Sequence, residues 1–595
     1  MLKKNFGRKK NSVNKLLNVL IIAALFAALV LSGGCGGGGG STDVPKLAAE
    51  SAVTEAPEEK QEAQKEIRVA VIKEEGTPDE EAFKEAGLTD AADAGQEQPE
   101  QKSGQPAAAV PRRMLRSVVL GAASADDVSS IEEVIIPGNV SLVGMNAFDS
   151  RWSSLKRVII NDTKVKLSYR TFNNCPNLEE VCIGEGTSSN YFDFKNYISA
   201  HYWDSYSYPD QAFYNCPRLR VIRFGHVAPP ANTAFISSCG GSVGGTAIEA
   251  PYAKYGEYAG RFGSRYTVRG MTWSESFPDT MLVNQISIPG THDSCTYGVD
   301  SAFVEEAETQ VYTLSEQLDK GIRCFDLRPH HANSDVNDIE VYHGPIACNI
   351  SFHSAFRTLR DHVAAHPRDF VIALVNHEMP SAGDVALEYC DLVGKVEAGN
   401  NGIQDALLEL GGYLAEFKPG MTVKDMRGKV LFILRDSVNG RDPVGAYTRS
   451  WGSHTYSAAL ESKYGRTDLL VQDKNSTDDE ACADKLSAVQ QTLNEFAGRV
   501  RGNHSYNGWC VNHTSGYYTK VYITLLVTGV WVDGINYPYN AEKVNKATAD
   551  HIGGLNGPAG IIQMDFAGKP DRSHWAKTYQ TRGDVLLNAV INHNF

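Results

Sequence analysis

The residues of this chain best suited to chemistry are two histidines, an arginine and three carboxylates that lie beyond residue 290. They are His292, Asp293, Asp326, Arg328, His343 and Asp565. One imidazole can take a proton from an attacking hydroxyl while another protonates a leaving oxygen, and a guanidinium can stabilise the charge of a phosphorane. Asp326 and Arg328 are two residues apart on a predicted strand, so their side chains share a face. Together these residue types indicate phosphodiester cleavage.

Short apolar runs that end in polar residues must position these side chains. The runs are "NQISIPG", "IRCFDLRP", "DFVIALVNHE", "KVLFILRD", "DLLVQD", "VYITLL" and "GIIQMDF". Helical stretches such as "SFHSAFRTLRDHVAAH" and "DKLSAVQQTLNEFAGRV" separate them. Apolar strands alternating with helices predict parallel βαβ units, and about eight of them favour an α/β barrel of the TIM type. The polar residues then meet at the carboxyl-terminal mouth of the barrel.

Several of these segments resemble bacterial phosphatidylinositol-specific phospholipase C. The matching segments are "ISIPGTHDS", "EQLDKGIRCFDLRPH", "VYHGPI" and "IIQMDF", with "VQDKN" and "VNHTS" as two further ones. The resemblance covers nearly all of residues 271–595. It implies a distorted TIM-type barrel that cleaves a membrane phospholipid, phosphatidylinositol or the glycosylated anchors built on it, without a cofactor.

The resemblance also implies a role for each histidine. His292 is expected to be the general base on the inositol 2-hydroxyl, oriented by Asp565. His343 is expected to be the general acid on the diacylglycerol oxygen, supported by Asp293. The adjacent His292 and Asp293 are therefore expected to serve opposite sides of the reaction.

The phosphate is expected to bind Arg328, with Asp326 beside it. A calcium site needs several oxygen ligands, and a lone Asp326 beside a cationic Arg328 is a poor cage for that ion. None of the eleven cysteines shows C-x-x-C spacing, which argues against a zinc site. The sequence therefore predicts a reaction without a metal ion.

Contacts to the headgroup are expected from three further positions. Arg435 and Asp473 resemble family residues that hydrogen-bond inositol hydroxyls, and His377 stands next to Asn376 where the family commonly has a lysine. Three tryptophans in predicted loops are candidates for insertion into lipid: Trp451, Trp509 and Trp531.

Residues 126–268 repeat a short pattern. "IEEVII" begins at 131, "LKRVII" at 155, "LEEVCI" at 178 and "LRVIRF" at 219, each with apolar residues at the same relative positions. A repeat in the low twenties with one strand per unit predicts a leucine-rich-repeat solenoid. The units resemble the bacterial surface type, and we expect their exposed inner strand face to bind a protein or a glycan.

The amino-terminal segment resembles a bacterial lipoprotein signal over residues 1–35. A basic stretch precedes the apolar "LLNVLIIAALFAALVL", and "SGGC" places small residues before Cys35, the expected site of lipidation. Residues 36–125 are rich in Glu, Ala, Gln and Pro, which predicts a disordered acidic linker. The chain is thus expected to be exported and anchored at the bacterial surface, with repeats and barrel loosely joined.

Charge and length restrict the remaining possibilities. The 595 residues are enough for more than one domain, and a formal net charge of −14 provides no basic surface for nucleic acid. Two alternatives to a phosphatidylinositol phospholipase stay open: a leucine-rich-repeat adhesin with an inactive barrel, and a phosphodiesterase that acts on a different phospholipid headgroup.

Overall fold

The computed structural model describes most of the chain beyond residue 127 and two short segments before it. The described residues are 69–71, 114–115 and 128–595, with gaps at 139, 141, 187, 201–210, 232, 237–244, 301–303, 332–338, 377, 379–410, 436–444, 449–450, 452–454 and 526–527. The predicted signal, Cys35 and His377 therefore lie outside the described residues. Residues 66–595 form one compact unit.

The repeats build a parallel sheet. Its order is β1 (Val69–Val71), β3 (Glu133–Ile136), β5 (Arg157–Ile160), β8 (Glu180–Ile183), β10 (Val221–Phe224), β11 (Ala247–Ala250) and β12 (Thr267–Gly270). Equivalent residues of successive repeats pair, as Glu133 does with Arg157 and Arg157 with Glu180. Because side chains alternate along a strand, the second and fourth residues of β3, β5, β8, β10 and β11 enter the repeat core, where Phe148, Phe172 and Phe213 stack at 4.7 and 4.8 Å.

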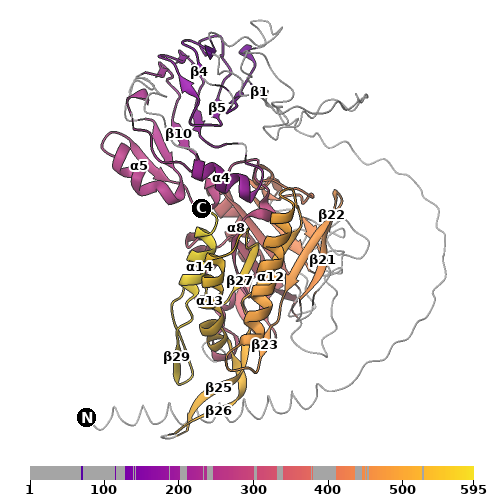
Figure 1. Cartoon of the computed structure of the whole chain (residues 1–595). Helices are drawn as coiled ribbons and strands as arrows, with labels where there is room; N and C mark the ends of the chain where they lie inside the picture. Colours follow the sequence, from indigo (N-terminus) through magenta and orange to yellow (C-terminus); the bar gives the residue numbers. More distant parts are fainter. Residues whose placement is uncertain are drawn as a thin grey trace, which may run out of the picture. The chain divides into compact units, whose positions relative to one another are not determined.

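Smaller elements complete the repeat region (Figure 1). They are β2 (Met114–Leu115), β4 (Leu142–Val143), β6 (Lys166–Leu167), β7 (Phe172–Asn173), β9 (Phe213–Tyr214), α4 (Tyr191–Ala200) and α5 (Tyr255–Phe262). Strands β1 and β2 fall inside the segment predicted to be a disordered linker. β1 pairs with β3 and β2 with β4, so at these two places the prediction was wrong.

A closed barrel follows the repeats. Its strands are β13 (Ile288–Thr291), β14 (Cys324–Leu327), β18 (Phe370–Val375), β19 (Lys429–Leu434), β20 (Ala446–Tyr447), β21 (Thr455–Ser462), β22 (Gly465–Gln472), β24 (Trp509–His513) and β27 (Ile561–Met564). Among the described residues the barrel thus has nine strands rather than about eight. Strand β21 runs antiparallel to both neighbours, which distorts an otherwise parallel barrel.

One predicted barrel strand, "VYITLL", lies elsewhere. It belongs to β25 (Tyr517–Leu525), which pairs with β26 (Thr528–Asn536) in a hairpin and, through its first residues, with β23 (Ser476–Thr477). The barrel position is taken instead by β24, whose five residues are all buried. Because β25 follows the carboxyl end of β24, the hairpin extends from the mouth of the barrel (Figure 1).

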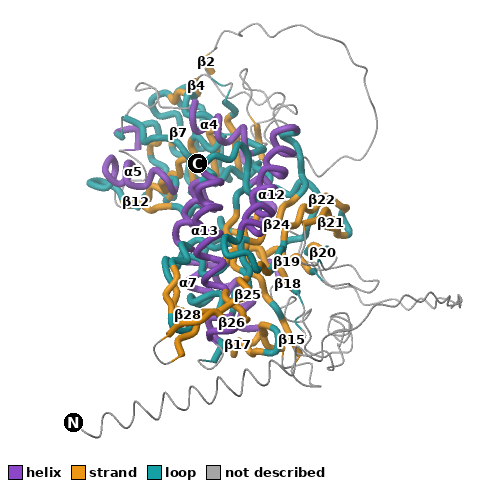
Figure 2. Tube along the Cα trace, turned by 60° about the horizontal axis from the view of Figure 1, so that its bottom comes forward, coloured by secondary structure: helices purple, strands orange, loops and turns teal. Residues whose placement is uncertain are grey.

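Helices surround the barrel strands (Figure 2). They are α6 (Val304–Ala307), α7 (Leu314–Asp319), α8 (Phe352–Ala365), α11 (Val423–Met426), α12 (Ala483–Gly502), α13 (Tyr537–Gly553) and α14 (Gly583–Asn592). The two helices predicted most clearly from the sequence are α8 and α12. Two small antiparallel sheets lie outside the barrel: β15 (Pro329–His331), β16 (Ile339–His343) and β17 (Ile346–Ser351), and β28 (Arg572–His574) with β29 (Lys577–Tyr579). Of the helices that the structure describes, none is long and apolar enough to cross a membrane.

The repeats pack tightly against the barrel, contrary to the expected loose junction. Tyr191 and Phe194 of α4 belong to the hydrophobic core of the barrel, and the Phe194 and Phe277 rings are 5.3 Å apart. The ring of Phe595 stacks on that of His226 at 4.4 Å. These contacts involve the amino-terminal end of the barrel, opposite the mouth.

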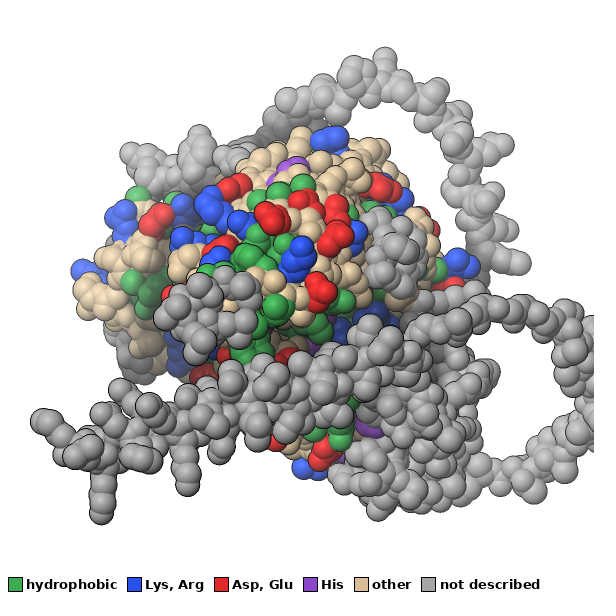
Figure 3. Space-filling model, turned by 90° about the horizontal axis from the view of Figure 1, so that it is seen from below, with side chains coloured by type: hydrophobic (Ala, Val, Ile, Leu, Met, Phe, Trp, Pro, Cys, Tyr) green, Lys and Arg blue, Asp and Glu red, His purple; other side chains and the backbone are tan. Residues whose placement is uncertain are grey.

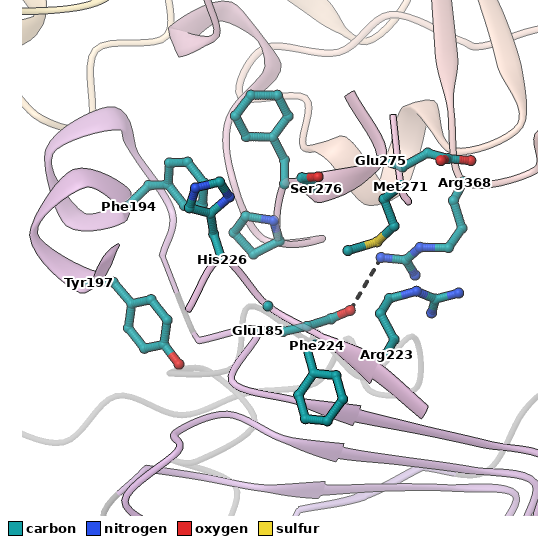
Figure 4. Close-up of a pocket in the computed structure, with 13 residues that line it drawn as sticks. Glu185, Phe194, Tyr197, Arg223, Phe224, His226, Met271, Glu275, Ser276 and Arg368 are labelled. Atoms are coloured by element: carbon teal, nitrogen blue, oxygen red, sulfur yellow. Dashed lines mark hydrogen bonds and ion pairs between the residues drawn. The ribbon is translucent and has the colours of Figure 1, made fainter. Parts of the chain in front are cut away.

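The inner face of the repeat sheet is also covered at this junction. Arg223 is 6% exposed and lines a small pocket together with barrel residue Arg368, which forms a 3.2 Å ion pair with Glu185 (Figure 4). Arg157 lies 3.9 Å from Asp279. The exposed inner face expected from the sequence is therefore closed where the barrel contacts it.

Candidate active site

The predicted catalytic residues come from the mouth of the barrel. His292 and Asp293 follow β13, Asp326 lies within β14, and Asp565 follows β27. Strands β13, β14 and β27 are direct neighbours, so their carboxyl ends bring these side chains together. His343 reaches the same place from outside the barrel, as the last residue of β16.

His292 is held by Asp565. The two side chains meet at 2.9 Å between Nδ1 and Oδ1, and the other oxygen of Asp565 accepts the backbone N–H of Gly516 at 3.0 Å. Gly516 has φ +150°, and a Cβ there would come within 2.9 Å of the Asn475 carbonyl oxygen. The carboxylate is thus fixed on both sides, and because it only accepts, Nδ1 carries the proton and Nε2 is the atom that can exchange one.

Asp293 lies between the two histidines and the arginine. Its Oδ2 is 3.2 Å from His292 Nε2 and 3.5 Å from His343 Nε2, while its Oδ1 is 2.7 Å from Arg328 Nε. The residue has φ +46°, a left-handed conformation that is costly for a side chain other than Gly, Asn or Asp. The sequence assigned Asp293 to His343 alone, but the structure places it against both histidines.

Arg328 is surrounded by carboxylates. Besides Asp293, its guanidinium lies 2.9 Å from Asp326 Oδ2 and 3.5 Å from Glu378 Oε2. Although burial opposes the charged form, Asp293 and Asp326 hold the pKa of Arg328 well above its usual range. Burial likewise opposes ionisation of Asp326, but Arg328 and His292 keep its pKa below the usual value. The guanidinium is therefore a permanent positive charge that is 14% exposed at the mouth.

The pKa of His292 is strongly shifted by its neighbours. Burial lowers its pKa, but the charges of Asp293 and Asp565 outweigh that effect and raise it to about 9. The rings of His292 and His343 are 6.5 Å apart, a separation that leaves one imidazole on each side of the Asp293 carboxylate. At this spacing the two histidines can transfer protons on the two sides of a phosphodiester, while the fixed cation stabilises the charge of its oxygens.

Two family models match parts of the chain. Residues 286–393 match the model of the phosphatidylinositol-specific phospholipase C X domain, and residues 123–239 match the BspA-type leucine-rich repeat region, with six copies. Residues 286–393 are therefore similar to the phosphatidylinositol-specific phospholipase C X domain. The X-domain match begins in the segment that leads into β13 and includes His292, Arg328 and His343.

Curated and solved proteins are similar to part of the chain. A 1-phosphatidylinositol phosphodiesterase of Listeria monocytogenes is 27% identical over 204 residues, which is 34% of this chain and 56% of that protein. A protein of the same name from Staphylococcus aureus is 24% identical over 305 residues, 50% of this chain and 88% of that protein. A solved phospholipase of Staphylococcus aureus covers 55% of this chain at 18% identity, with a TM-score of 0.41.

A second group of polar residues lies beside the X-domain histidines. Asp473 accepts a 2.9 Å hydrogen bond from Trp451 Nε1, and the Arg435 guanidinium lies 3.9 Å from the centre of the Trp451 ring. Burial opposes ionisation of Asp473, but His513 and Arg435 lower its pKa to about 2. Both predicted headgroup residues that the structure describes, Arg435 and Asp473, therefore lie together.

The tryptophans divide clearly by exposure. Trp451 and Trp509 are 6% and 2% exposed and cannot reach lipid, so those two predictions were wrong. Trp531 is 43% exposed on β26, next to the exposed Val532. Figure 3 views this end of the molecule, where hydrophobic side chains gather among charged ones on the described surface.

The described residues contain one cluster with the geometry of a metal site. His292, Asp293 and Asp326 offer ligand atoms within 4.8 Å of one another. Both carboxylates, however, are already paired with Arg328. A divalent ion there would have to compete with a buried guanidinium, so the donor set fits a metal poorly.

Sequence reasoning missed three residues of this site. Glu378 contacts Arg328, and the Tyr537 hydroxyl lies 3.0 Å from His343 Nε2. His513 ends β24 fully buried, with its ring 6.0 Å from that of His292. His513 at the end of β24 and Glu378 after β18 stand at the carboxyl ends of barrel strands, as His292 and Arg328 do, which is a signal that could have found them. Tyr537 follows a hairpin strand and gave no such signal.

Proposed function

We propose that the protein is a phosphodiesterase that cleaves phosphatidylinositol, or glycosylphosphatidylinositol, to diacylglycerol and inositol 1,2-cyclic phosphate. The observation that carries the proposal is the position of Asp293, within 3.5 Å of Nε2 of both histidines and 2.7 Å from Arg328. A phosphate bound at the guanidinium is then within reach of two imidazoles on different sides.

In the first step His292 acts as the base. Asp565 holds Nδ1, so Nε2 of the neutral ring, which lies 3.2 Å from Asp293 Oδ2, removes the proton of the inositol 2-hydroxyl. The oxygen attacks the phosphorus atom, and the five-membered ring of the cyclic phosphate closes. Each such proton transfer contributes on the order of 10² to 10⁴ in rate.

Arg328 and His343 act on the other parts of the phosphodiester. The guanidinium stabilises the equatorial oxygens, whose charge grows in the transition state. His343 gives its Nε2 proton to the diacylglycerol oxygen as the bond between phosphorus and that oxygen breaks. Arg435 and Asp473, which lie together at the mouth, bind hydroxyls of the inositol ring.

The reaction is proposed to need no metal ion, because Arg328 supplies the positive charge between Asp293 and Asp326. Turnover should therefore be unchanged by excess chelator. Arg328→Asp should abolish metal-free activity. If calcium restored the activity of this variant, a metal ion could replace the guanidinium as the positive charge at this position. Loss of wild-type activity with chelator would refute the metal-free step.

The enzyme is further proposed to act at a membrane surface. Trp531 and Val532, exposed on the hairpin at the mouth, are suited to contact the bilayer that holds the substrate. Acylation of Cys35 would anchor the chain at the bacterial surface. Labelled fatty acid should then enter wild-type protein but not Cys35→Ala in the cell of origin.

Replacing each histidine tests the proposal. His292→Ala and His343→Ala should each lower kcat by at least about 10³. Arg328→Lys should also be severe, because an ammonium cannot reproduce a bidentate guanidinium. His551→Ala is a suitable control, since this histidine bonds to Asn494 on α12. Near-normal turnover in either variant would show that the replaced histidine takes no part in proton transfer.

A further inference from the structure

Tyr537 is a buried tyrosine whose hydroxyl lies 3.0 Å from Nε2 of His343. It is the first residue of α13, directly after the hairpin strand β26. The Asn536 side chain caps the helix by accepting the backbone N–H of Tyr539, and Pro538 stiffens the first turn. Tyr537 is 6% exposed and packs against Phe566, so its hydroxyl is held in place.

The other ring nitrogen of His343 is also occupied. Nδ1 lies 2.8 Å from the carbonyl oxygen of Ala307, which can only accept a hydrogen bond. Nδ1 therefore keeps its proton whether the ring is neutral or charged. All exchange of protons at His343 must take place at Nε2, the atom that faces Tyr537 and, at 3.5 Å, Asp293.

We propose that Tyr537 is a positioning residue for the general acid. Its hydroxyl can accept a hydrogen bond from Nε2 when His343 is protonated and donate one to Nε2 when His343 is neutral. It thereby keeps the ring in one orientation before and after proton transfer. This inference rests on the proposed function and adds to it a residue outside the predicted acid–base set.

The protons balance without a change in Tyr537. The Nε2–H bond of His343 breaks and its proton moves to the leaving oxygen as the bond from phosphorus to that oxygen breaks. The Tyr537 O–H then rotates toward the vacated Nε2 lone pair, and this hydrogen bond stabilises the neutral imidazole. The hydroxyl keeps its own proton throughout.

The surroundings of Tyr537 fit a hydroxyl that stays protonated. Burial, together with the charges of Asp293 and Asp565, holds the pKa of Tyr537 well above its usual range. The ring of Tyr517 packs against it edge-on, with 5.9 Å between centres. The groups that face Nε2 of His343 are thus the Asp293 carboxylate and a hydroxyl that can either accept or donate a hydrogen bond.

Tyr537→Phe removes only the hydroxyl and tests the inference. Tyr539→Phe is its matched control, because Tyr539 is a buried tyrosine of the same helix whose hydroxyl bonds to the Glu480 carbonyl oxygen at 2.8 Å. Two soluble inositol phosphodiesters are compared, one with an alkyl leaving group and one with a nitrophenol that needs no protonation. With the alkyl substrate, Tyr537→Phe should lower kcat roughly 10-fold to 10²-fold at similar KM, with less than about threefold loss for the nitrophenyl substrate.

Several outcomes would overturn the inference. Equal loss on both substrates would indicate a structural role, and no loss on either would show that His343 needs no support. In a His343→Ala background Tyr537→Phe should have no further effect, and an additional loss would show that it acts elsewhere. Nitrogen NMR of wild-type protein provides a test without a variant: neutral His343 must carry its proton on Nδ1, and a proton on Nε2 would contradict the account. Failure of wild-type protein to cleave either substrate would refute the proposed function instead.

Discussion

Replacing Asp293 by asparagine should change the pH dependence of the enzyme in a defined direction. His292 has an ordinary pKa of 6.5 that is raised to about 9, and the charge of Asp293 is the largest single cause that raises it. The rise of about 2.5 units corresponds to roughly 3 kcal/mol that favours the protonated imidazole. Asparagine keeps the shape and tolerates φ +46°, so the variant removes the charge with little change in backbone.

The expected result follows from the need for a neutral base. The acid limb of kcat/KM should have its midpoint near pH 9 in the wild type and at least about one unit lower in Asp293→Asn. The plateau value of kcat/KM at high pH should also fall, because Arg328 loses its ion pair with Asp293. Profiles from pH 5.5 to 10 on a water-soluble inositol phosphodiester measure both effects. An unchanged midpoint would show that Asp293 does not control His292, and the electrostatic account of the site would be wrong.

The same shift links His292 to stability. Because the folded pKa is raised, the stabilisation is fully present below about pH 6.5 and is lost as pH rises through about 9. Wild-type protein should thus lose up to about 3 kcal/mol over this range through this group, and Asp293→Asn should lose less. Denaturant unfolding at pH 6 and pH 9.5 measures the difference, and equal losses in the two proteins would contradict it.

Three further predictions concern the membrane, the core and the repeats. Trp531→Ala should lower activity on phosphatidylinositol vesicles roughly tenfold but leave activity on a soluble substrate unchanged. The control Tyr464→Ala, which removes an aromatic ring that is 52% exposed at the opposite end of the barrel, should change neither activity. If both variants lowered vesicle activity equally, membrane contact by the hairpin would be excluded. Asp369→Asn should cost about 3–5 kcal/mol of folding free energy, because it leaves the buried Arg323 without its 2.6 Å partner; a loss under about 1 kcal/mol would contradict this. Deleting residues 66–268 should lower the melting temperature of the barrel, because α4 contributes side chains to the barrel core. An unchanged melting temperature would show that the repeats and the barrel are loosely joined after all.

Much of the fold follows from periodicity. The repeat strands were predictable because apolar residues recur at the same relative positions in each repeat. The barrel was predictable because polar residues follow apolar strands. The hairpin was mistaken for a barrel strand because "VYITLL" is as apolar as a buried strand. The sequence does not reveal that this segment forms a hairpin at the mouth of the barrel.

The residue types of the proposed catalytic set follow from the sequence, but their contacts do not. Short motifs identified His292, Arg328, His343 and Asp565; His292, Arg328 and Asp565 follow barrel strands, whereas His343 ends β16 outside the barrel. The bridging position of Asp293 depends on a left-handed backbone and on neighbours more than thirty residues away. The packing of the repeats on the barrel was missed for a related reason, since Tyr191 and Phe194 lie in an insertion without a repeat pattern.

The central claim is intramolecular attack by the inositol 2-hydroxyl between two histidines and Arg328. Phosphorus NMR of the reaction on phosphatidylinositol, with excess chelator and with phosphatidylcholine offered in parallel, tests it most directly. The account predicts that inositol 1,2-cyclic phosphate appears first and the open monophosphate later, with phosphatidylcholine left intact. Direct formation of the open monophosphate, or cleavage of phosphatidylcholine in preference, would contradict it.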